Sequence, residues 1–304
     1  MGAWGDRRLE SRYDRSREQA AAAAAQGRHA DALEHSRAAL DAVRTLQARH
    51  PDDARHHPVL AAALYNHGGR LLATGAHDEA LVVLREAAQR YEDLGRSDPS
   101  AYTVPRIDVT LRIGQALADA GRAQEAHPLL REAVERYPDA PTNDLVERAL
   151  GLVRAWTALG ICLSALGRYD EALEAADQAL FTAERTREEA GISPLQYDWL
   201  ARAGTSFQNA ARQWMSAAVY AMERHARAGR WGIAADAANI AVRVAAGLAA
   251  LPGSALGDVY QLLLARAQSI WAVAEGSAPA ATADQQRSPA ILLLLHQAGW
   301  RLPS

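Results

Sequence analysis

The sequence predicts an all-α protein, built as an array of about five helical hairpins and closed by a C-terminal capping helix. Two observations carry this prediction. A segment that begins with glycine and has alanine at its sixth position recurs at 27–33, 75–81, 121–127, 167–173 and 229–235, with spacings of 48, 46, 46 and 62 residues. Seven residues after each of these alanines comes another, at Ala39, Ala87, Ala133, Ala179 and Ala241. Self-similarity at such a spacing is typical of stacked repeats.

Each recurring segment is expected to form the turn of a hairpin. Its glycine can adopt the left-handed conformation that ends a helix. The acidic residues that follow, at Asp31, Glu79, Glu125 and Glu171, suit the positive end of the next helix dipole. The alanines Ala32, Ala80, Ala126 and Ala172 are expected where the two helices cross, because a small side chain permits close approach. Gly68, Gly114 and Gly160 share a mid-helix position, which indicates close packing against the partner helix.

Helix-breaking residues and the spacing of apolar residues predict the bounds of the individual helices. We expect hairpins at 12–26 with 30–49, 58–74 with 77–95, 105–120 with 123–137, and 142–166 with 169–190. The prolines Pro51, Pro58, Pro99, Pro105, Pro138 and Pro141 are assigned to the joints. A long helix should start at Ser193-Pro194 and run to about 228, followed by helices at 231–250 and 254–275.

These helices give a domain plan. It consists of an N-terminal extension at 1–11, repeats at 12–250, a capping helix at 251–275, a flexible linker at 276–289 and a C-terminal apolar segment at 290–304. The last segment should contain a short helix at 291–296. Its Trp300 could cap the open end of the chain's own stack or bind a second copy, so a homodimer is possible.

The fourth repeat has a distinctive pattern, which consists of Trp156, Leu159, Gly160 and Leu163, then Gly167, Tyr169, Glu171, Ala172 and Ala179. In this pattern the repeat resembles the tetratricopeptide repeat family. Across the chain the resemblance covers roughly 12–250 and implies a right-handed α-solenoid. The period of 46 residues or more departs from the 34 of the standard repeat, and the excess is expected after the second helix, as at 91–102. Such long periods look like the repeat arrays of bacterial regulators.

Composition excludes several classes of protein. All 33 basic residues are arginine, which excludes a P-loop lysine and a Schiff-base lysine. The single cysteine, Cys162, excludes an internal disulfide and any zinc site with two thiolates. A net charge of −3 does not indicate binding to nucleic acid. The sequence has no apolar run long enough to predict a membrane span, and its N-terminal segment does not predict a secretory signal. We therefore expect a cytoplasmic protein. Its 69 alanines, together with arginine in place of lysine, suggest a GC-rich bacterial genome.

No catalytic or metal-binding constellation emerges from the sequence. His50, His56 and His57 cluster in a proline-flanked joint, but the ligand set is incomplete and solvated histidines are the favoured interpretation. Cys162 lies between leucines of a first helix and is interpreted as a buried thiol. We expect no catalytic residue, no metal and no cofactor.

The resemblance implies that function resides in a concave groove lined by the first helix of each hairpin. The groove-lining positions of the family's repeat, transferred one by one to this sequence, fall on Arg17, Tyr65, Asn66, Asp108, Arg112, Gln115, Asp119, Arg154, Thr157 and Ser164. The family's carboxylate clamp would fall on Arg17, Ala21, Asn66, Asp108 and Arg112. Ala21 cannot bond and Asp108 would repel a carboxylate, so Asn66 and Arg112 remain the best contacts. Solvated polar residues on a helix face are an equally open interpretation.

Three functions follow as hypotheses. The leading one is a non-enzymatic scaffold or adaptor that binds a peptide or protein partner in its groove. The second is a regulatory sensor, in which a peptide or small ligand in the groove controls a partner. The third, an enzyme on a helical scaffold, ranks last because no catalytic group was found.

Overall fold

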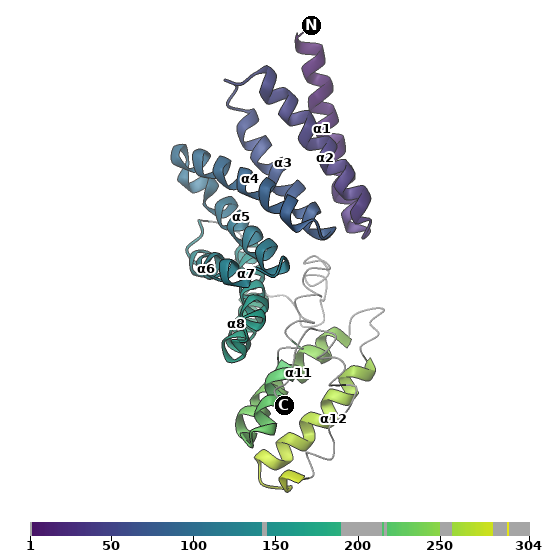
Figure 1. Cartoon of the computed structure of the whole chain (residues 1–304), viewed down its shortest axis with the longest axis vertical. Coiled ribbons are helices and arrows are strands. Elements are labelled where there is room, and N and C mark those ends of the chain that lie inside the picture. Colours follow the sequence, from purple (N-terminus) through teal and green to yellow (C-terminus); the bar gives the residue numbers. More distant parts are fainter. Residues whose placement is uncertain are drawn as a thin grey trace. The chain divides into compact units, whose positions relative to one another are not determined.

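The chain folds into consecutive antiparallel helices in a computed structural model, which describes residues 2–141, 145–189, 215, 218–249, 257–281 and 291 (Figure 1). The helices are α1 (Gly2–Ala25), α2 (His29–Arg49), α3 (His56–Ala73), α4 (His77–Ser97), α5 (Pro99–Asp119), α6 (Ala123–Arg136), α7 (Leu145–Ala165), α8 (Tyr169–Glu189), α11 (Trp231–Ala249) and α12 (Gly257–Ala274). Residues 218–227 are also helical, and the described residues contain no strand. The all-α helical-repeat prediction is therefore confirmed.

The chain divides into two compact units, Met1–Asp144 and Leu145–Ser304. In the first, each of the helices α1 to α5 packs against the next along the chain, so that α5 packs against α6. In the second, α7 packs against α8 and α11 against α12. Each hairpin thus buries its apolar faces against its own partner and, in the first unit, against the neighbouring hairpin.

The hairpin turns form as the glycine pattern predicts. The glycines of the recurring segments, Gly27, Gly75, Gly121, Gly167 and Gly229, have φ between 69° and 79°. At the α3–α4 turn, the Ala76 amide donates to the Leu71 carbonyl and the Gly75 amide to the Leu72 carbonyl, both at 3.0 Å. These two bonds satisfy carbonyls that the end of the helix would otherwise leave unpaired.

The helix crossings use small residues, as expected. Ala32, Ala80, Ala126 and Ala172 are at most 1% exposed. A Cβ added to Gly68 would lie 2.6 Å from two carbon atoms of Leu84, and one added to Gly114 would lie 2.6 Å from Leu130 Cδ2. The leucine of the second helix therefore packs directly onto the backbone of the first.

Two helices start earlier than the sequence indicates. Helix α1 begins at Gly2 instead of residue 12, so the expected N-terminal extension belongs to the first helix. Helix α5 begins at Pro99 instead of residue 105, because the Asp98 carboxylate caps it by accepting from the Ala101 amide at 3.1 Å and proline suits the first helical position. The assignment of Pro105 to a joint was wrong. It lies inside α5, and Pro58 lies inside α3.

The residues that make the repeat period long are consequently helical. Between α4 and α5 a single residue, Asp98, lies outside the helices, so residues 91–102 lengthen both of them. Longer helices bury more apolar surface per hairpin than a loop would.

The second unit has an alanine-rich core around α11 and α12. Alanines 234, 237, 238 and 241 are fully buried there, together with Met222 and Ile270. Ile291 is 3% exposed and belongs to the same core, so this residue of the C-terminal apolar segment packs onto its own unit. Trp300, most of the expected linker and residues 194–214 of the long helix expected to run to about 228 lie outside the described residues. Residues 218–227 of that expected helix are described and helical.

One described helix, α11, is long and apolar enough to cross a membrane by length and composition alone. The core helix of a soluble protein passes the same test, and the buried alanines of α11 belong to the core of the second unit.

Candidate functional site

The clearest polar feature among the first helices of the hairpins is a contact between α3 and α5. The Arg112 guanidinium lies over the Tyr65 ring, 4.2 Å from its centroid. It also lies against Gly69, one turn along α3 from Tyr65, where an added Cβ would be 1.7 Å from Arg112 Nη1. The glycine backbone and the aromatic ring therefore fix the position of this cation.

A second arginine lies beside the first. Burial lowers the pKa of Arg70, and the charge of Arg112 lowers it further. No carboxylate pairs with Arg70 or Arg112 in the described part of the chain. Asn66, four residues before Arg70 and thus on the same face of α3, is exposed. Two cations, an amide and a ring therefore share one surface, which we call the Tyr65–Arg112 face.

Tyrosines lie behind this surface. Tyr91 of α4 is 7% exposed, and its ring centroid is 6.3 Å from that of Tyr102 in α5. Burial raises the pKa of Tyr91 above its ordinary value, and the nearby Tyr65 and Asp108 raise it further. The phenol therefore stays protonated and neutral at physiological pH.

Asp108 has a structural partner. It accepts a hydrogen bond of 2.5 Å from the hydroxyl of Tyr137, whose side chain is 1% exposed. The carboxylate thus ties α5 to the residue that follows α6.

The other expected groove residues are scattered. Arg17 is exposed, with its nearest carboxylate, Glu18, at 3.9 Å, and Gln115 is half-buried on α5. Arg154 and Thr157 belong to the second unit, where Arg154 is exposed. Thr157 is buried and donates to the Val153 carbonyl at 2.7 Å. Of the expected set, Tyr65 and Arg112 are in direct contact, and Asn66 is the exposed residue that follows Tyr65 in α3.

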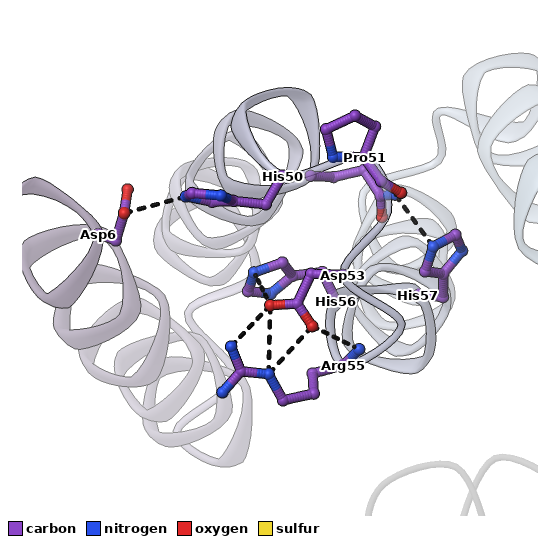
Figure 2. A network of polar contacts seen from close by, with 8 residues as sticks. Asp6, His50, Pro51, Asp53, Arg55, His56 and His57 are labelled. Carbon is purple, nitrogen blue, oxygen red and sulfur yellow. Dashed lines mark hydrogen bonds and ion pairs between the residues drawn. The ribbon is translucent and has the colours of Figure 1, made fainter. Parts of the chain in front are cut away.

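The histidines at the α2–α3 joint are engaged in ion pairs and hydrogen bonds (Figure 2). Asp6 of α1 accepts from His50 Nε2 at 3.0 Å and from Arg49 Nη1 at 3.1 Å. Asp53 binds the Arg55 side chain, and this cation holds the pKa of the Asp53 carboxyl well below its usual range. The Asp53 carboxylate also lies 3.5 Å from His56 Nε2.

His57 makes a contact of 3.4 Å with Gln47. Within the described residues, no three His, Cys, Asp or Glu side chains are arranged to hold a metal ion. The contacts of Asp6 instead attach the first turns of α1 to the end of α2.

The comparisons with known proteins agree with the repeat architecture. The tetratricopeptide repeat family matches residues 109–137 and, in a second form, residues 153–183. These segments cover most of α5 with α6 and most of α7 with α8. The chain is therefore a helical-repeat protein that contains tetratricopeptide repeats. A search of curated proteins finds no match to this repeat protein.

The chain is similar to several solved structures. A Rap protein complexed with Competence and Sporulation Factor has 16% identity and a TM-score of 0.53, with 95% of this chain and 65% of that one covered. The chain thus spans less than two thirds of that Rap protein. The apo form of RapI (10% identity, TM-score 0.47) is covered to 83%, by 77% of this chain. Nearly identical TPR-like repeats from Podosopora anserina (18% identity, TM-score 0.45) are covered to 99%, by 90% of this chain.

Sequence reasoning missed Arg70 and the tyrosines behind Tyr65. Arg70 follows Asn66 by four residues, and this helical spacing was the available signal. The tyrosines come from α4 and α5, so only the packing of the helices reveals that they are neighbours.

Cys162 of the repeat protein is expected to resist modification in the folded state. The side chain is fully buried, and burial raises the pKa of the thiol to about 11. Because the thiolate is the reactive form, a disulfide reagent at neutral pH should react only after denaturation. Stoichiometric reaction of the native protein within the mixing time would contradict this placement.

His67 should make stability depend on pH. Its Nδ1 lies 2.8 Å from Ser36 Oγ, and burial lowers its pKa from the ordinary 6.5. Between the lowered pKa of the folded state and 6.5, the unfolded chain binds more protons than the folded chain. Stability is therefore full above about pH 6.5 and falls as the pH decreases towards the folded pKa.

The corresponding experiment compares urea unfolding midpoints at several pH values between 7.5 and 5.5. We expect the midpoint of the wild type to fall with pH more steeply than that of His67→Asn. His29→Asn, which changes an exposed histidine at the start of α2, serves as the matched control. Parallel curves for the wild type and His67→Asn would show that His67 does not carry the effect.

Proposed function

We propose that this repeat protein is a non-enzymatic scaffold that holds a peptide, or a segment of another protein, against the Tyr65–Arg112 face. The observation that carries the proposal is the contact between Arg112 and Tyr65, which joins the first helices of two successive hairpins beside the exposed Asn66. Tyrosine and arginine are enriched among the residues that dominate protein interfaces. A partner could therefore contact both hairpins at once.

The proposal is supported by the repeat family, whose concave surfaces bind extended partners. It is also consistent with the described chemistry. The cations of this face are arginines without a carboxylate partner in the described residues, and Cys162 is buried with a raised pKa, so it does not provide a nucleophile. Fold alone does not determine function, so the assignment depends on these side chains.

The test is retention of partners from a lysate of the source organism by the tagged protein. We expect Asn66→Ala combined with Arg112→Ala to lose partners that the wild type retains. The matched control is Gln89→Ala with Arg85→Ala, which removes an amide and an arginine from the exposed side of α4. Equal retention by both double variants would refute the assignment of the Tyr65–Arg112 face.

A regulatory sensor is the second candidate, because the Rap protein of similar fold was solved as a complex with Competence and Sporulation Factor. In this version a bound peptide changes the pitch of the helical array and thereby controls a partner. X-ray scattering with and without saturating peptide should then show a change in molecular dimensions. Identical profiles would favour the scaffold.

A further inference from the structure

Most half-buried arginines in the described part of the first unit pair with a carboxylate, and two do not. Six arginines in the described part of this unit are half-buried: Arg70, Arg90, Arg106, Arg112, Arg122 and Arg136. Four of them pair with carboxylates: Arg90 with Glu86, Arg106 with Glu92, Arg122 with Glu125 and Arg136 with Glu132. Arg70 and Arg112 have no carboxylate partner in the same part of the chain, although burial makes an unpaired charge costly.

The two exceptions are also neighbours. Arg112 Nη1 lies against Gly69, the residue that precedes Arg70 in α3, and the charge of Arg112 contributes to lowering the pKa of Arg70. Arg112 is held by the ring of Tyr65 at 4.2 Å and fits against the backbone of Gly69. The nearest acidic group on its own face of α5, Asp108, instead accepts from the buried Tyr137. Within the described residues, two cations thus lie near one another and no carboxylate pairs with either of them.

We propose that Arg70 and Arg112 form a binding site for one oxyanion, a carboxylate or phosphate group carried by the bound partner. The inference rests on the proposed function and specifies the chemistry of the ligand. Guanidinium groups bind such oxyanions through paired charge-assisted hydrogen bonds, and one anion between two cations relieves their repulsion. The site uses Arg70, which lies outside the five-position frame of the family's carboxylate clamp.

Calorimetric titration with four short peptides tests the site and identifies the source of the anion. The peptides are acetyl-Ala-Glu-Ala-amide, acetyl-Ala-Gln-Ala with a free C-terminal carboxylate, acetyl-Ala-phosphoserine-Ala-amide and the neutral acetyl-Ala-Gln-Ala-amide. At least one anionic peptide should bind the wild type more tightly than the neutral one. Arg70→Gln and Arg112→Gln should each weaken that binding by about tenfold, which corresponds to ~1.4 kcal/mol. Arg85→Gln, an exposed arginine of α4, should have no effect.

Gly69→Ala provides a test that keeps both charges. The added Cβ would occupy the position of Arg112 Nη1, so the guanidinium must move, while alanine favours the helix. This variant should remain folded, as circular dichroism can verify, and should bind the anionic peptide more weakly than the wild type does.

The outcomes separate the two proposals. Equal binding of all four peptides, or wild-type binding by Arg70→Gln and Arg112→Gln, would overturn the oxyanion site. If partner retention still depended on Asn66 and Arg112, the scaffold proposal would stand without it. Conversely, loss of anion binding in Arg70→Gln, together with unchanged partner retention by Asn66→Ala/Arg112→Ala, would show that an anion binds at these arginines but that the retained partner does not carry it. That result would overturn this proposal and refute the partner face.

Discussion

Replacing Arg266 by methionine should lower the free energy of unfolding of the second unit by about 3–5 kcal/mol. Arg266 and Glu223 form a two-bond ion pair, with Nε–Oε1 at 2.6 Å and Nη2–Oε2 at 2.9 Å. Their side chains are 1% and 2% exposed. Removing the cation would leave the Glu223 carboxylate in an alanine-rich core without its charge partner, and such a charge is strongly destabilising.

The double variant Glu223→Leu/Arg266→Met separates burial of a charge from loss of packing. Because a buried ion pair replaced by apolar residues of similar volume is often neutral or stabilising, the double variant should recover most of the stability lost in Arg266→Met. Urea unfolding of the three proteins provides the comparison. A double variant no more stable than Arg266→Met would show that the pair does more than neutralise charge.

Gly68→Ala should destabilise the first unit by about 1–3 kcal/mol, even though alanine is the better helix former. The new methyl group would lie 2.6 Å from both Cγ and Cδ2 of Leu84, which is itself fully buried between α3 and α4. Leu84→Ala should cost about 2–5 kcal/mol because it leaves a cavity at the same crossing.

The two changes should compensate when they are combined. The methyl group at position 68 would occupy space that Leu84→Ala empties, so the double variant should lose less stability than the sum of the single variants. Gly160→Ala is the matched control. A Cβ there would lie 3.4 Å from the Ala172 carbonyl oxygen and 3.6 Å from the Ala175 Cβ, and should be tolerated. Additive losses at Gly68 and Leu84 would contradict direct packing at this crossing.

The sequence is sufficient to predict the hairpins because the physics of the turn is local. A glycine with positive φ and an alanine five residues later recur at fixed positions, and each has its role within a few residues of its own turn. The starts of α1 and α5 were misplaced for a related reason. Pro105 was read as a breaker, whereas the Asp98 cap and Pro99 had already started α5 six residues earlier.

The Tyr65–Arg112 face was only partly predictable. Tyr65, Asn66 and Arg112 follow from repeat positions, but their chemistry depends on contacts between α3 and α5, which are 47 residues apart at Tyr65 and Arg112. Whether an arginine is paired depends on which carboxylates its neighbours bring, as Arg106 with Glu92 shows. The isolation of Arg70 and Arg112 is a property of the packed helices, and no local pattern encodes it.

Site-specific photo-crosslinking tests the central claim most directly. A photoreactive amino acid placed at position 66 should capture a partner in cells of the source organism, because Asn66 is the exposed residue of the Tyr65–Arg112 face. The same group at position 45, on the exposed side of α2, serves as the control. We predict a discrete adduct from position 66 and none of the same mass from position 45. Adducts of equal yield from both positions, or from position 45 alone, would contradict the assignment of this face.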